Sequence, residues 1–252
     1  MIASCPMEIA SPNGLWDPQS AYDQAARGYD QWSWQRVWRE VEGSGIERAL
    51  PTAGSHRILD IGCGTGSLLR RIHNHYRGDA ELVGLDVSSG MLEQARLKFA
   101  RETVEFIHGD LLQTRFKPAS FDAVFMCRVA SHLANLEPYF DAISNVLRPG
   151  GILVLSDVHN GHPYECTRLP VDGYKISVKT HKHAPAEILG IASHTALMKV
   201  TEETYGLDAL STALLADPEL PASLREQAFA GASNPFGFLV VFQRQQLRTH
   251  NT

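Results

Sequence analysis

Between residues 57 and 157, short apolar runs typical of buried strands take turns with longer runs whose apolar residues recur at helical spacing. Repeated strand and helix units of this kind predict a parallel sheet that is covered by helices on both faces. In such a sheet the ligand site lies at the carboxyl ends of the strands. The expected strands are 57–60, 82–86, 104–108, 121–127 and 151–156, the last after a turn at 148–151, and the expected helices start at 67 and span 91–101 and 136–147.

The chain has a different pattern on either side of this region. Residues 1–17 have the composition of a loose tail, whereas 18–50 combine helical spacing with many aromatic residues, which would pack on the sheet or form a lid over a ligand. Residues 159–184 break the rhythm with turn-forming residues and an alternating stretch at 174–183, so we expect an insertion over the active site. Later in the chain we expect helices at 185–198 and 207–230 and strands at 199–205 and 236–242.

Length and composition fit a single α/β domain with a cap, because 252 residues that are 44% hydrophobic can bury a sizeable core. We divide the chain into a tail and helical cap at 1–50, a core at 51–158, and a lid with the rest of the same domain at 159–252. The net charge of -5 offers no broad phosphate-binding surface, which disfavours nucleic acid as a partner. No segment approaches the roughly 18 apolar residues of a membrane span, so no membrane partner is expected.

The four cysteines are Cys5, Cys63, Cys127 and Cys166, and their wide spacing makes no CxxC pair of the type that zinc sites and redox centres use. This usage is typical of a reduced protein. We therefore expect a cytoplasmic protein, monomeric or homodimeric, whose partner is a small molecule.

The segment from Arg57 to Leu68 carries an acidic residue, Asp60, from a strand into a glycine-rich turn. Glycines in such a turn let the backbone bend tightly and approach a ligand closely. The dinucleotide fingerprint requires a glycine where this chain has Ser67, so the loop favours a cofactor other than NAD. Asp86 ends the next strand, where a carboxylate can accept hydrogen bonds from both hydroxyls of a ribose, as NAD and other nucleoside cofactors require.

The glycine loop resembles the first motif of the class I S-adenosylmethionine-dependent methyltransferases. The segment 108–112 is similar to the motif of that family whose acid meets the adenine amino group, and 121–124 and 147–151 resemble its fourth-strand motif and the turn before its fifth strand. The stretch 22–32 resembles the N-terminal segment in which a tyrosine reaches the methionine end of the cofactor.

The resemblance implies a Rossmann-like, seven-stranded and mostly parallel sheet with helices on both faces and a reversed final hairpin, into which 236–242 would insert. It implies S-adenosyl-L-methionine as the cofactor. The candidate cofactor-binding residues are Tyr22, Tyr29, Asp60, Gly62, Gly64, Asp86, Met91, Asp110, Leu111 and Cys127.

Transfer of a methyl group to a hydroxyl or an ammonium also needs a base, and histidine suits this role at neutral pH. Three of the eleven histidines follow the fourth and fifth strands, where a substrate should approach, and these are His132, His159 and His162. His132 matches a histidine that lines the cofactor pocket in the family, and Asp157 could orient one of the three. His181 and His183 would face the same way from a strand, but no carboxylate spacing supports a metal site and we expect none.

The sequence therefore favours a methyltransferase that acts on an oxygen or nitrogen of a small molecule. The aromatic cap favours an apolar or ring-containing acceptor, such as a secondary metabolite. One alternative is an NAD-dependent oxidoreductase, which would explain Gly62, Gly64 and Asp86 but not Gly109 and Asp110. Another is a protein that binds S-adenosylmethionine as a sensor or for a reaction other than methylation.

Overall fold

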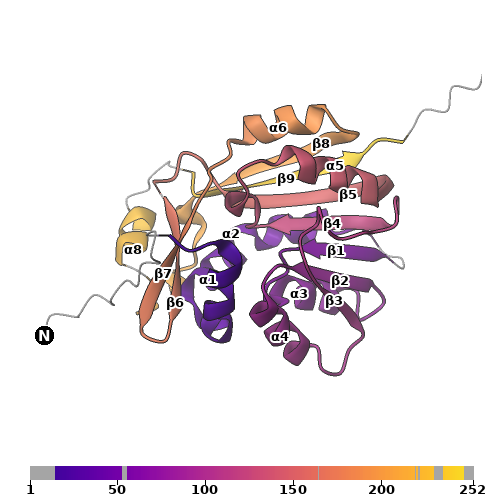
Figure 1. Ribbon diagram of the computed structural model, residues 1–252. Helices are drawn as coiled ribbons and strands as arrows, with labels where there is room; N and C mark the ends of the chain where they lie inside the picture. The colour runs from indigo at the N-terminus through magenta and orange to yellow at the C-terminus, as the bar shows by residue number, and fades with distance from the viewer. Residues whose placement is uncertain are drawn as a thin grey trace, which may run out of the picture.

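A seven-stranded sheet forms the centre of the computed structural model, which describes residues 15–52, 56–163, 165–218, 220, 222–229 and 235–246 (Figure 1). Most of the predicted N-terminal tail therefore lies outside the described residues. The strands of this sheet are β1 (Arg57–Ile61), β2 (Glu81–Asp86), β3 (Val104–His108), β4 (Phe121–Cys127), β5 (Leu147–Val158), β8 (Leu197–Tyr205) and β9 (Gly237–Arg244).

The strand order is β3-β2-β1-β4-β5-β9-β8. The first five strands in the chain pair in parallel, whereas β9 pairs antiparallel with both β5 and β8. The predicted parallel sheet with a reversed final hairpin is confirmed. The last strand of the chain inserts between β5 and β8, as the resemblance implied.

The start of β5 differs from the sequence prediction. Residues 148–151 were expected to form a turn before the strand, but β5 already begins at Leu147. The pairing register with β4 shifts between Phe121 and Ala123, and Gly150 has a φ of +83°. Proline and glycine here mark an irregular stretch within a strand, because a bulge needs the same residue types as a turn.

Helices cover both faces of the sheet (Figure 1). On one face, Phe140 of α5 and Ile188 of α6 join a core with alternate residues of β4, β5 and β9. On the other face, α2, α3 and α4 bury residues such as Ile46, Leu69 and Leu92 against the sheet. The helices are α1 (Pro18–Ala25), α2 (Ser33–Ala49), α3 (Ser67–His75), α4 (Ser89–Lys98), α5 (Glu137–Val146), α6 (Pro185–Ser193), α7 (Thr212–Leu215) and α8 (Ala222–Phe229), with short 3-10 helices η1 (Ala26–Gln31), η2 (Ala130–His132) and η3 (Leu207–Ala209).

The expected alternating strand at 174–183 is shorter than predicted and belongs to a second sheet. It forms β7 (Tyr174–Lys179), which pairs with β6 (Cys166–Val171) in an antiparallel hairpin. This hairpin packs against α1 through small and branched apolar residues, including Ala21, Leu169 and Ile176. Figure 1 shows α1 and the hairpin together beside one end of the large sheet. In the described part of the chain, no helix is long and apolar enough to cross a membrane.

Candidate functional site

A cavity of about 300 Å³ lies where β1, β2, β3 and β4 end. Each strand delivers a short segment to its wall, because the carboxyl ends of parallel strands meet at one edge of a sheet. The N-terminal segment contributes further wall residues, among them Asp17, Tyr22, Tyr29 and Gln35. Of the predicted cofactor-binding residues, the wall contains Tyr22, Tyr29, Asp60, Gly62, Gly64, Asp86, Asp110, Leu111 and Cys127.

The glycine loop after β1 is shaped by residues with positive φ. Gly62 has a φ of +66° and Gly64 a φ of +54°, a region that side chains disfavour. A Cβ atom on Gly62 would lie 2.3 Å from a methyl group of Val129, so this glycine lets the loop pack directly on the end of β4. The backbone N–H of Gly64 donates to Oδ2 of Asp86 at 2.7 Å, which joins the loop to the end of β2.

Two carboxylates are held in fixed orientations on the cavity wall. Asp86 accepts a second hydrogen bond at Oδ1 from the backbone of Ser88, at 2.8 Å. Asp110 accepts one from the backbone of Leu112 and one from the hydroxyl of Tyr139, both at 2.7 Å. Since each carboxylate oxygen can accept two hydrogen bonds, all four oxygens can still accept one from a ligand. The sequence analysis missed Tyr139, whose partner lies 29 positions away in the chain.

Asp60 is the most deeply buried acid on this wall, with 3% of its surface exposed. Burial raises the pKa of its carboxyl to about 8. Within the described residues, no hydrogen-bond donor contacts this carboxyl. Because Asp60 lines the cavity, its carboxyl can accept hydrogen bonds from a ligand that brings donors of its own.

Arg128 lies next to this acid and was not predicted from the sequence. It follows β4 directly and has a φ of +62°, an unusual value for a residue with a side chain. Its Nη1 donates to Oε1 of Gln35 at 3.0 Å, and its Nε lies 3.4 Å from Oε1 of buried Glu42. Both partners belong to α2, so an ion pair connects the N-terminal helices to the cavity. No local sequence signal marks this residue, because its partners are distant in the chain.

His132 lies on the cavity wall and is paired with Tyr22. Its Nε2 is 2.8 Å from the hydroxyl of Tyr22, and either group can donate depending on the tautomer. Burial lowers the pKa of His132 to about 4, so the ring is neutral at physiological pH. Asp157, which could have oriented a histidine ring, instead accepts the backbone N–H of Ser131 at 2.8 Å. It therefore holds the η2 turn that carries His132.

A second, smaller cavity of about 40 Å³ adjoins the first. The two share Tyr22, Tyr29, Gln35, Arg128 and His132. Its other walls are mainly aromatic, and successive rings are in contact, with centroids 4.6 to 6.4 Å apart. The aromatic residues that are not shared are Trp32, Trp34, Trp38 and Phe236.

Other predicted residues lie away from these walls. His159 and His162 follow β5, and their rings contact Phe238 and Phe236 rather than either cavity. Met91 is buried in the first turn of α4, where its backbone N–H donates to the Ser88 hydroxyl. His183 lies beyond the end of β7 and its Nε2 is 2.8 Å from the Leu133 carbonyl oxygen. In residues 15–52, 56–163 and the other described ranges, no group of three or more His, Cys, Asp or Glu could hold a metal ion.

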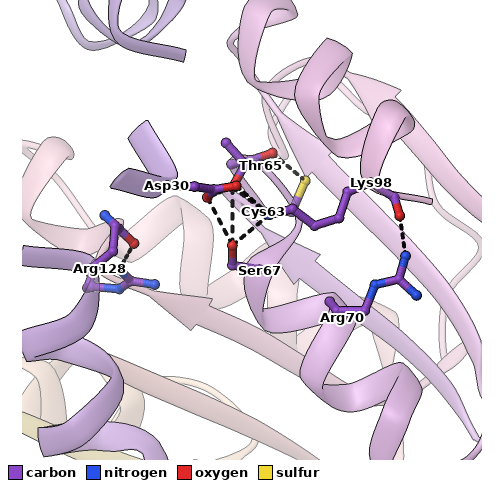
Figure 2. A network of polar contacts seen from close by, with 9 residues as sticks. Asp30, Cys63, Thr65, Ser67, Arg70, Lys98 and Arg128 are labelled. Atoms are coloured by element: carbon purple, nitrogen blue, oxygen red, sulfur yellow. Dashed lines mark hydrogen bonds and ion pairs between the residues drawn. The ribbon is translucent and has the colours of Figure 1, made fainter. Parts of the chain in front are cut away.

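Two aspartates fasten the N-terminal segment across the cofactor cavity. Asp30 of η1 accepts hydrogen bonds from the hydroxyls of Thr65, at 2.6 Å, and Ser67, at 3.1 Å, and pairs with Lys98 at 2.8 Å (Figure 2). Burial of Asp30 raises its pKa, but the bonds from Lys98, Thr65 and Ser67 outweigh this and hold the pKa below its usual value.

The second aspartate is Asp23 of α1, which binds the first turn of α4. Its Oδ1 accepts from the Ser88 hydroxyl at 2.7 Å and from the Gly90 backbone N–H at 2.8 Å. A carboxylate is favourable there, because the N-terminus of a helix has unpaired N–H groups and a positive dipole end.

We expect Asp30→Asn to release bound S-adenosylhomocysteine about two- to tenfold faster than the original protein. The amide keeps the shape but loses the charge, and one charge-assisted hydrogen bond of a half-exposed group contributes on the order of 1 kcal/mol. Stopped-flow fluorescence of the nearby tryptophans would measure the dissociation rate. Asp141→Asn on the exposed face of α5 is the matched control. An unchanged rate in Asp30→Asn would show that this contact does not restrain the segment.

Comparison with known proteins agrees with this geometry. Residues 58–151 match a family model described as a methyltransferase domain. The O-methyltransferase cnsE of Penicillium expansum is 33% identical over 162 residues, which cover 63% of this chain and 54% of that protein. The O-methyltransferase rstn1 of Aspergillus nomiae is 28% identical over 149 residues, which cover 58% of this chain and 61% of that protein. The chain thus spans little more than half the length of these relatives.

Solved structures share the fold across most of the chain. An S-adenosylmethionine-dependent methyltransferase from Mesorhizobium loti superposes with a TM-score of 0.62 and 22% identity, covering 81% of this chain and 97% of that one. Phosphoethanolamine N-methyltransferase 2 of Haemonchus contortus, in complex with S-adenosyl-L-methionine, gives a TM-score of 0.64 and 18% identity, covering 94% of this chain and 61% of that one. At these identities the likeness shows a common fold.

Proposed function

We propose a methyl-transfer function for this chain, which belongs to the class I S-adenosylmethionine-dependent methyltransferase family. The acceptor is an oxygen or nitrogen of a small molecule. The relatives cnsE and rstn1 are named as O-methyltransferases, which favours oxygen. No relative reported above is an oxidoreductase, so the NAD-dependent alternative has no support.

The residues around the larger cavity fit S-adenosylmethionine in charge and in hydrogen-bonding capacity. Asp110 has the acceptor capacity for the adenine amino group, and Leu111 offers an apolar face for its ring. Asp86 can accept hydrogen bonds from ribose hydroxyls. Asp60, buried and without a donor among the described residues, suits the cationic amino group at the methionine end. When bound, the cofactor supplies a methyl group activated by an adjacent sulfonium.

The pair formed by Tyr22 and His132 is suited to take a proton from the acceptor. The neutral His132 ring can receive a proton at Nε2, and Tyr22 bridges it through its hydroxyl at 2.8 Å. Tyr22 would then pass its own proton to His132 as it takes one from the acceptor. Both residues border both cavities, so the pair lies where a methyl donor in one and an acceptor in the other would meet.

The smaller cavity suits the end of the acceptor that lies next to the methyl donor. Its stacked indole and phenyl rings offer flat apolar faces and exclude water from the site of transfer. The N-terminal segment, Thr167 of β6 and Phe236 form part of its walls, in keeping with a cap at 1–50 and a lid after residue 158 that select the substrate. These walls favour a small, apolar or ring-containing acceptor, of which a cavity of about 40 Å³ holds only a part.

The observation that carries the proposal is the convergence of Asp60, Asp86 and Asp110 from three strand ends on one cavity that also contains His132. Incubation of a metabolite extract with the protein and isotopically labelled S-adenosylmethionine tests it by mass spectrometry. We expect an acceptor whose mass rises by one labelled methyl group, together with S-adenosylhomocysteine. Tight binding of NAD in calorimetry, without affinity for S-adenosylmethionine, would overturn the proposal. Binding of S-adenosylmethionine without product in any extract would favour the sensor alternative.

Asp86→Ala should weaken the binding of S-adenosylhomocysteine about 10- to 100-fold, because the ribose loses charged acceptors and Gly64 and Ser88 lose their partner. Isothermal titration calorimetry would measure the change. Asp122→Ala is a useful comparison, since Asp122 binds Arg57 and Arg148 near the start of β4, away from the cavity. Equal affinities for Asp86→Ala and the original protein would remove Asp86 from the cofactor site.

A further inference from the structure

Arg128 occupies the point where three cavities meet. It borders the cofactor cavity, the aromatic cavity and a third cavity of about 430 Å³ between α2 and α3. Among the described residues, only Gln35 also borders all three cavities. The third cavity is rich in cations, and its charged lining residues are Asp30, Arg39, Glu42, Arg70, Arg71, Lys98 and Arg128.

The guanidinium of Arg128 has more donors than the surrounding chain can use. A guanidinium carries five N–H groups, and Nη1 donates to Gln35. Its Nε is buried and has no hydrogen-bond partner among the described residues, since Glu42 lies 3.4 Å away. The other oxygen of Glu42 accepts the Ser156 hydroxyl at 2.7 Å, so Glu42 cannot turn fully toward Arg128. A cationic group with spare donors at a cavity wall is suited to an anionic ligand.

Asp60 lines the same cavity, and its carboxyl has no hydrogen-bond donor among the described residues. Asp60 is close enough to Arg128 for the guanidinium to lower its pKa, yet burial still raises the pKa to about 8. Arg128 therefore has N–H groups to spare, whereas the Asp60 carboxyl has no donor among the described residues. An α-amino acid group supplies both, because its carboxylate accepts and its ammonium donates.

We propose that Arg128 binds the carboxylate at the amino-acid end of S-adenosylmethionine, while Asp60 faces the ammonium of the same group. The inference rests on the proposed function. Arg128, Asp60 and the glycine loop all line the cofactor cavity, so one ligand can reach both side chains. Since Gln35 and Glu42 hold Arg128, the position of α2 becomes coupled to the presence of this carboxylate.

A ligand that lacks only the carboxylate tests the proposal. Calorimetry compares S-adenosylhomocysteine with its decarboxylated form in the original protein, in Arg128→Met and in Arg128→Lys. The original protein should prefer S-adenosylhomocysteine by about 10- to 100-fold, as expected for charge-assisted hydrogen bonds. In Arg128→Met the preference should shrink to within about threefold, with affinity for the decarboxylated ligand nearly unchanged. Arg128→Lys should keep part of the preference, since it retains the charge without the planar fork.

A purely structural role for Arg128 predicts a different result. Its loss would weaken both ligands by the same factor, and that outcome, or an undiminished preference in Arg128→Met, would overturn the inference. Removal of Arg128 leaves Glu42 as an unpaired buried charge, so the variant could unfold. The double variant Arg128→Met/Glu42→Gln removes both charges and permits the same comparison of ligands. Arg148→Met, on the exposed ion pair with Asp122, is the control and should keep the full preference.

The proposed function has a separate point of failure. If the original protein bound neither ligand, the methyltransferase proposal would fail, and this inference with it. If the original protein bound S-adenosylhomocysteine tightly but Arg128→Met kept the preference, only the role of Arg128 would be wrong.

Discussion

Replacing His132 by alanine is expected to lower kcat about 10²- to 10⁴-fold, the range typical for loss of a general base. Affinity for S-adenosylhomocysteine should change far less, because the acids proposed to bind its adenine, ribose and ammonium groups, Asp110, Asp86 and Asp60, remain in place. Steady-state kinetics with the acceptor found by isotope labelling, together with calorimetry, separates the two effects. Tyr22→Phe should show a smaller loss of kcat, since a water molecule can replace the bridging hydroxyl.

The pH dependence distinguishes this histidine from an ordinary one. Its lowered pKa of about 4 means that the neutral form, which can accept a proton, is present throughout pH 5 to 9. Protonation of His132 should therefore cause no loss of kcat until the pH falls toward 4. A fall in kcat near pH 6.5 that disappears in the alanine variant would contradict this view.

His194→Ala, at the exposed end of α6, is the matched control and should retain full activity. His162→Ala tests the other histidine position. If kcat fell in His162→Ala and not in His132→Ala, the assignment of His132 as the base would be wrong. The predicted roles of His159 and His162 would then take precedence over the Tyr22 and His132 pair.

Replacing Asp60 by asparagine should make the ligand-free protein more stable at neutral pH and weaken cofactor binding. The carboxyl has an ordinary pKa near 3.8 when unfolded and about 8 when folded. Between these values the folded state retains a proton that the unfolded state has released. The free energy of unfolding therefore falls by about 1.4 kcal/mol per pH unit from this residue alone. Below pH 3.8 and above pH 8 the residue adds no further pH dependence.

Chemical unfolding from pH 5 to 8 measures the effect. The gain in stability of Asp60→Asn over the original protein should grow with pH across this window, toward a few kcal/mol at pH 7. Differences between the two proteins are the relevant quantity, because buried Asp157, with a pKa raised to about 6, titrates in the same range in both. Parallel stability curves would mean that the pKa of Asp60 is not raised.

Cofactor binding provides an independent measurement of the same acid. An ammonium group favours the ionised carboxylate, so binding at pH 7 should release up to one proton from Asp60. Calorimetry in buffers with different ionisation enthalpies would detect this proton, and Asp60→Asn should release less. Asp60→Asn is therefore expected to have a higher free energy of unfolding and a lower affinity for the cofactor. This trade-off is common for residues that bind a ligand at the expense of stability.

Local patterns predicted most of the sheet because each βα unit carries its own signals. The limits of β2, β3 and β4 agree with the prediction to within one residue, since buried parallel strands appear as continuous apolar runs. The prediction failed where two structures need the same residues. Proline and glycine at 148–151 suit a turn and a bulge equally, and the alternation at 174–183 continues four residues beyond the end of β7 at Lys179.

The sequence by itself determined the repeated strand and helix units, the glycine loop, and the acids at the ends of β1, β2 and β3. Each of these features depends on residues that are close together in the chain, so a short segment of sequence is enough to predict it. It could not pair Tyr22 with His132, which are 110 positions apart, or bring Gln35 and Glu42 to Arg128. Only the tertiary structure decided these contacts, because they depend on how α1, α2 and the ends of β4 and β5 pack together. The cofactor cavity is thus largely readable along the chain, whereas the groups that surround the site of transfer come together only in the folded protein.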